Sequence, residues 1–224
     1  MIRNFRRRFQ GETDEDLNKD TLYCISLMQH HGAPTRLLDF TFSSYVGALF
    51  AIENSENPPY RKEKDTPVLL CVRIEWIESK VEKIVDKKLL KGRLYDTQRN
   101  DGTFLPMFMG KKPKKFVYLD NPIRQNTRLV IQQGIFLCPG DVSGSFEDNF
   151  KNLKGWNYKK NVVKIYLNFS KSERKFALQE LHRMNINQAS LFPGLDGYSR
   201  SMKQLMPIWH RMSQDNAGKG GRYK

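Results

Sequence analysis

The sequence predicts a single α+β domain with a central sheet flanked by helices, and three observations lead to this class. Segments with apolar residues at helical spacing are interspersed with short, strand-like apolar runs. Their order lacks the regular strand–helix–strand rhythm of a doubly wound sheet. No linker divides the chain, so we predict a basic arm over residues 1–12, one domain over residues 13–212 and a disordered basic tail over residues 213–224.

The first fifty residues predict two helices joined by a stiff loop. The basic N-terminus is expected to be frayed, and a helix is expected over residues 13–29. Gly32 permits a positive φ in the turn that follows. Ser43 or Ser44 is expected to cap the next helix, whose apolar residues lie within 46–52.

The middle of the chain predicts two strands. The near-continuous apolar run over residues 68–74 indicates a strand buried on both faces, and residues 116–119 indicate a short one. Residues 76–90 have helical spacing, whereas residues 93–115 lack a period and are predicted as loop.

The last third predicts strands and helices around a glutamine pair. Residues 129–137 are strand-like, and Gly134 inside them indicates either a bulge or a close approach by another group. A surface connection is predicted over residues 139–161, and a strand over residues 162–169. Ser170 and Glu173 predict a capping box at the start of a helix that continues through Met184. A closing helix is predicted over residues 197–206.

Charge and cysteine usage limit the classes of function. The net charge of +14 attracts polyanionic partners, although basic runs in loops and termini slightly favour a solvated basic surface. Three scattered cysteines without CxxC spacing indicate buried thiols, and no metal site is expected. Without an apolar run long enough to span a bilayer, we expect a soluble cytoplasmic protein with no membrane partner.

The densest group of reactive side chains lies in the loop over residues 29–41. Phosphate-binding glycine motifs and the nucleophile-elbow motif are absent from the sequence. An arginine fork, imidazoles, hydroxyls and amides together suit a dinucleotide such as NAD. The alternative is structural, with Arg36 paired to Asp39 and the threonines capping backbone. The candidate catalytic residues are His30, His31, Arg36 and Gln133, and the candidate cofactor-binding residues are Thr35, Asp39, Thr41 and Gln132.

Three blocks of this sequence resemble the bacterial FRG domain family, named for a Phe-Arg-Gly triplet. They are Gln29–Thr41 with the following Ala-Leu-Phe-Ala helix, Arg128–Phe136, and Ser190–Gly197. The order of the blocks matches the family over most of residues 20–205. The triplet itself does not occur upstream of the loop, so we expect this chain to lack the segment that carries it.

The resemblance implies, by analogy of layout, a fold similar to ADP-ribosyltransferases. On that analogy Arg36 would contact phosphate or ribose, a loop histidine would contact ribose, and Gln133 would polarise the acceptor or the ribose. The alternative is a non-catalytic module that binds nucleic acid or a nucleotide signal, for example in phage defence. In that module Phe116, Tyr118 and Trp156 would stack on bases. A plain interaction domain with an unknown oligomeric state is the third hypothesis.

Overall fold

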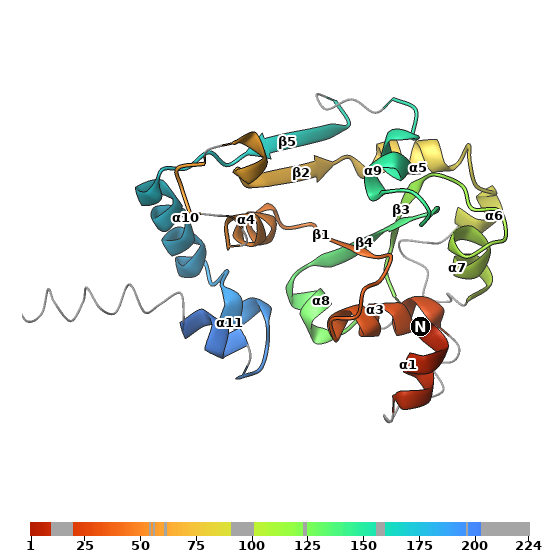
Figure 1. Ribbon diagram of the computed structural model, residues 1–224, viewed down its shortest axis with the longest axis horizontal. Coiled ribbons are helices and arrows are strands. Elements are labelled where there is room, and N and C mark those ends of the chain that lie inside the picture. The colour runs from red at the N-terminus through yellow and green to blue at the C-terminus, as the bar shows by residue number, and fades with distance from the viewer. Residues whose placement is uncertain are drawn as a thin grey trace, which may run out of the picture.

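The computed structural model describes residues 1–9, 20–53, 55, 57–60, 62–90, 101–122, 125–155, 160–195 and 197–202. Helices surround two small antiparallel sheets, which confirms the predicted α+β class (Figure 1). The amino-terminal part of the predicted 13–29 helix, residues 91–100, Trp156, the end of the predicted 197–206 helix and the tail lie outside the described residues.

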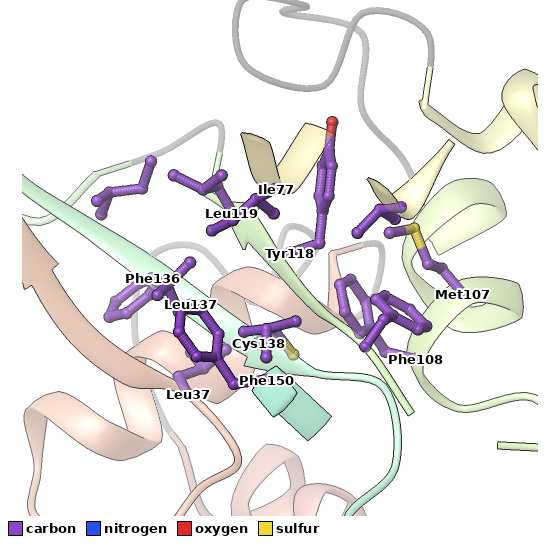
Figure 2. Packing of buried hydrophobic residues seen from close by; sticks show 14 of the residues in the cluster. Leu37, Ile77, Met107, Phe108, Tyr118, Leu119, Phe136, Leu137, Cys138 and Phe150 are labelled. Carbon is purple, nitrogen blue, oxygen red and sulfur yellow. The ribbon is translucent and has the colours of Figure 1, made fainter. Parts of the chain in front are cut away.

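A three-stranded sheet forms the centre of the main core. β4 (Gly134–Pro139) lies between β1 (Leu38–Thr41) and β3 (Val117–Asp120), antiparallel to both. Because β4 has a partner on each side and helices over it, five of its six residues are buried. Figure 2 shows side chains of β3 and β4 packed among residues from surrounding elements, including Leu37, Ile77, Met107, Phe108 and Phe150.

A separate two-stranded sheet pairs β2 (Val68–Val72) with β5 (Val162–Tyr166). The prediction of a strand buried on both faces at residues 68–74 is wrong. No residue of β2 is fully buried, and Cys71 is exposed. The strand also ends at Val72, because Ile74 already begins α5 and its side chain packs against the main core.

The helices around the main core correct several predictions. The expected frayed N-terminus forms α1, whose Ile2 and Phe5 pack against buried Cys24 and Met28 of α3. The predicted 76–90 helix is two helices. Part of the predicted 93–115 loop is helical, although Pro106 lies inside that helix. These helices are α1 (Ile2–Arg8), α3 (Thr21–His30), α5 (Ile74–Val81), α6 (Lys87–Leu90), α7 (Asp101–Phe108) and α9 (Phe146–Lys151), the last within the predicted surface connection.

A second, smaller core joins α4 (Ser44–Glu53), α10 (Lys171–Arg183) and α11 (Gln188–Leu191). Val46, Leu49 and Ile52 of α4 pack there against Leu181 and Leu191. The predicted caps are confirmed. The Ser43 hydroxyl accepts a hydrogen bond from the Val46 N–H at 3.3 Å, and Ser170 forms a reciprocal capping box with Glu173. A 3₁₀ turn, η1 (Glu63–Asp65), precedes β2, and residues 197–202 are helical.

The segment before β4 is helical rather than extended. Asn126 caps α8 (Thr127–Ile131) by accepting the Leu129 N–H at 2.8 Å, so the strand predicted at residues 129–131 is wrong. Gln133 takes a positive φ of 48° in the turn to β4. The close approach predicted at Gly134 is confirmed, because an added Cβ would meet the Leu129 carbonyl oxygen at 3.2 Å and its side chain closer still.

Candidate functional site

A polar cleft lies where the C-terminus of α3, strand β1, α8 and the turn after α11 meet. Figure 1 places α8 between α3 and α11. Its outer part encloses about 410 Å³, a volume within the range of small-molecule sites. Residues that line the cleft include Gln29, His30, Asp39, Asn126, Thr127, Arg128, Gln132, Phe192, Pro193, Gly197 and Arg200.

The acidic wall of the cleft consists of Asp39 and Gln29. The Gln29 amide donates to Asp39 Oδ1 at 2.9 Å, and its carbonyl oxygen accepts from the Thr35 hydroxyl. Thr35 Oγ1 in turn accepts the Leu37 N–H at 3.1 Å, so backbone geometry fixes the amide orientation. The network therefore holds the carboxylate in one position.

The pKa of Asp39 lies above its ordinary value of 3.8. Asp39 is exposed as a whole residue, but its carboxyl group lies against the cleft, and burial there raises its pKa. The hydrogen bond from Gln29 and the charge of Arg128 act in the opposite direction. The carboxyl group is thus partly desolvated, yet it has a donor and a cation that favour the ionised form.

The cationic wall consists of Arg128, Phe192 and Arg200. The guanidinium carbon of Arg128 lies 4.2 Å from the centroid of the Phe192 ring, and that of Arg200 lies 5.8 Å from it. Burial lowers the pKa of Arg128, Asp39 raises it, and Arg200 lowers it. Two like charges therefore lie near one aromatic ring, and the carboxylate of Asp39 acts on the charge of Arg128.

His30 stands at the rim between the two walls. Burial lowers its pKa below 6.5, and the charges of His31 and Arg128 lower it further. The rings of His30 and His31 meet edge to face with centroids 5.1 Å apart. The neutral imidazole is therefore favoured near neutral pH, which leaves one ring nitrogen able to accept a proton.

Hydrogen bonds of Gln132 and Thr41 connect the elements that form the cleft. The Thr41 hydroxyl donates to the Gln132 carbonyl at 2.7 Å, and the Gln132 side-chain amide donates to the Leu191 carbonyl at 3.0 Å. This relay joins β1, the end of α8 and α11, so it fixes the cationic wall relative to the sheet.

The structure brings His30, Asp39 and Gln132 together in the cleft and places Thr35 one hydrogen bond behind Gln29. Four other predicted site residues do not line it: Thr41, which bonds the Gln132 carbonyl, and His31, Gln133 and Arg36. The exposed imidazole of His31 contacts His30. Gln133 is exposed, and its carbonyl oxygen accepts the Phe42 N–H.

Arg36 points away from the cleft toward α7. Its guanidinium donates to the Phe108 carbonyl and lies 5.9 Å from the Phe108 ring centroid. The predicted alternative of an Arg36–Asp39 pair does not form, because the Arg36 guanidinium is directed to Phe108. Arg36 thus anchors the loop to the main core.

Sequence reasoning missed the cationic wall. Arg128 and Phe192 lie within the second and third FRG-like blocks, but α8 was predicted as a strand, which hid their convergence on the loop. Arg200 had no motif to mark it. The blocks themselves were the available signal, since segments of one family signature often gather around one site.

Other candidates from the sequence are not accessible or not present among the described residues. Phe116 and Tyr118 are buried, at 0% and 4% exposure, so these rings are not available for stacking. The described part of the chain contains no group of three or more histidines, cysteines or acids placed to hold a metal ion. It also contains no helix that is both long and apolar enough to cross a membrane.

An α+β domain with a polar cleft is thus the class that fold and site define, and comparison with known proteins adds a similarity to one family over part of the chain. The FRG domain model matches residues 1–59, the segment that carries α1, α3, the histidine loop, β1 and α4. The expected FRG resemblance is confirmed for this segment, which supplies the acidic wall. No curated protein and no solved structure matches the chain.

Proposed function

We propose that this protein binds a nucleotide in the cleft, with NAD as the first candidate. The observation that carries the proposal is that a fixed carboxylate, Asp39, lines the inner part of the cleft with Arg128, and that Arg128 also lines the outer part with Arg200. Ribose hydroxyls donate hydrogen bonds to a carboxylate, whereas phosphate oxygens accept them from arginine forks. A ribose phosphate satisfies both walls at once.

The activity that we propose for this cleft is ADP-ribosyl transfer. The bond between ribose C1′ and nicotinamide breaks, and nicotinamide leaves with the bonding electron pair. An acceptor hydroxyl or amine then forms the new bond to C1′ and passes its proton to His30. Asp39 stabilises the positive charge that develops on the ribosyl group, a role for which the neutral Gln132 and Gln133 lack the charge.

Calorimetric titration of the full chain with NAD tests the binding proposal. Arg128→Gln should abolish saturable binding, because it removes the cation that faces Asp39 across the cleft. The matched control is Arg183→Gln, since Arg183 pairs with Glu180 on α10 and does not line the cleft. Binding lost in both variants, or absent from the wild type, would refute an NAD site here.

Release of nicotinamide from bound NAD tests the transfer step separately. Asp39→Asn keeps the size of the side chain and removes its charge, so we expect NAD binding with a turnover at least about 100-fold lower. Binding without any nicotinamide release by the wild type would leave a nucleotide-binding domain and remove the transferase activity.

The net charge of +14 favours a second candidate, nucleic-acid binding. Counterion release would make that affinity fall steeply as salt rises. A flat salt dependence would exclude it. A role in phage defence stays a prediction, whether the protein binds NAD or nucleic acid.

A further inference from the structure

We infer that Arg128 and Arg200 together form a diphosphate subsite, so that the cleft selects nucleoside diphosphate groups over monophosphates. This inference rests on the proposed nucleotide binding and adds the substrate class. It makes Arg200 the residue that determines phosphate number.

The geometry offers two separate guanidinium groups to one ligand. Both arginines line the outer part of the cleft, and both lie against the Phe192 ring, at 4.2 and 5.8 Å from its centroid. The close contact with the ring restricts the Arg128 guanidinium, and Arg200 lies near the same ring, so the donors of both forks are offered at the same wall. Each fork can bind two oxygens of one phosphate group.

The charges at this wall are not balanced by acids among the described residues. There, Arg200 forms no ion pair, and Asp39 is the acid that acts on Arg128 from the opposite wall. The like charges of Arg128 and Arg200 repel each other, and Arg128 is half-buried. An anion between them would relieve this repulsion, and a diphosphate brings a separate group to each arginine.

The position of Asp39 limits where a single phosphate could bind. A phosphate placed next to Asp39 would meet a carboxylate, so the favourable position is the outer side of Arg128, toward Arg200. A monophosphate there engages one fork fully. The second phosphate of a diphosphate engages the other fork.

Titration with AMP and ADP tests the inference on the full chain. We expect ADP to bind at least about tenfold more tightly than AMP, the gain of one charge-assisted contact. Arg200→Gln should reduce this ratio to near one while AMP affinity stays within about threefold, because Arg128 is intact. Since Arg200 is exposed, the variant should fold, and Arg183→Gln is again the matched control.

The outcomes separate this inference from the proposed function. Equal affinities for AMP and ADP in the wild type, or a ratio unchanged in Arg200→Gln, would overturn the diphosphate subsite and leave nucleotide binding standing. No binding of AMP, ADP or NAD would overturn both. Inorganic pyrophosphate is then used as a competitor of bound ADP. If pyrophosphate competes as strongly as unlabelled ADP does, the result would support the subsite but assign it to free diphosphate instead of a nucleotide.

Discussion

Gln29→Leu is the sharpest test of how the acidic wall is organised. Leucine has nearly the volume of glutamine, so the change removes two hydrogen bonds without leaving a large cavity. Asp39 loses its donor at 2.9 Å, and the Thr35 hydroxyl loses its acceptor. The carboxylate would then no longer be held in one position.

The expected loss of stability follows from those two contacts. The Asp39 carboxyl group is partly desolvated and Thr35 is only partly exposed, so neither group is fully compensated by water, and the net cost should be about 1–2 kcal/mol. For a chain of this size, that cost corresponds to a fall of about 2–8 °C in Tm. Affinity for NAD should also fall, because the hydroxyl acceptor in the cleft becomes mobile.

The loss should depend on pH in a defined direction. The Gln29 hydrogen bond favours the ionised carboxylate and lowers the pKa of Asp39 against the opposing effect of burial. Removing it raises the folded-state pKa further, so the variant is penalised where Asp39 is ionised. Below the ordinary value of 3.8 the group is protonated in both folded and unfolded states, and this part of the penalty vanishes.

Urea denaturation of wild type and variant at about pH 7 and about pH 3, the latter below the ordinary pKa of 3.8, measures the effect. Thr35→Ser is the matched control, since it keeps the hydroxyl. A penalty equal at both pH values would refute the proposed interaction with the carboxylate. Additive losses in the Gln29→Leu and Asp39→Asn double mutant would refute it independently.

Three further predictions concern the segments around the cleft. Gly197→Ala should cost about 1–3 kcal/mol, measured by thermal unfolding, because the new Cβ would lie 2.7 Å from Phe192 Cβ; an unchanged Tm would contradict this packing. Arg36→Ala should lower stability by about 1–3 kcal/mol, because the hydrogen bond to the Phe108 carbonyl and the contact with the Phe108 ring are lost, and calorimetry should find NAD affinity within about threefold of wild type; lost binding at unchanged stability would reverse that assignment. Ser170→Ala should cost about 1 kcal/mol in urea denaturation without changing NAD affinity, whereas Ser170→Asp should keep the cap.

The sequence predicts those helix starts and strands whose formation depends on residues close to one another in the chain. The cap at Ser43 and the capping box at Ser170 place hydroxyls next to the N–H groups that they satisfy, so the sequence predicts both helix starts. Strands β3 and β5 likewise follow from short apolar runs with β-branched or aromatic residues.

Elements decided by tertiary packing were not predicted. Residues 129–131 are apolar and two of them are β-branched, but a cap at Asn126 and the burial of Leu129 favour a helix there. The helix α7 has an internal proline and weak periodicity, and buried Phe104, Met107 and Phe108 hold it against the main core. Propensity alone could not reveal either outcome.

The residues of the candidate site also fall into those that the sequence predicts and those that only the tertiary structure reveals. His30 and Asp39 were predicted because one short loop concentrates their chemistry. Arg128 and Arg200 are remote in sequence, and only the packing of α8 and the 197–202 helix against that loop brings them to it. The sequence analysis predicted that Arg36 binds the ligand, because a guanidinium group suits a phosphate. The structure instead shows Arg36 donating to the Phe108 carbonyl, a contact across 72 residues that the sequence does not reveal.

The hydrogen bonds from Thr41 through Gln132 to Leu191 determine how ligand binding would change the stability of the domain. The two walls come from segments more than eighty residues apart, so the cleft is complete only after long-range contacts have formed. A ligand that spans both walls would bind the folded chain and not the unfolded one, and its free energy would add to the stability of the whole domain. Saturating ligand should therefore slow hydrogen exchange in both cores, including α10, which does not line the cleft.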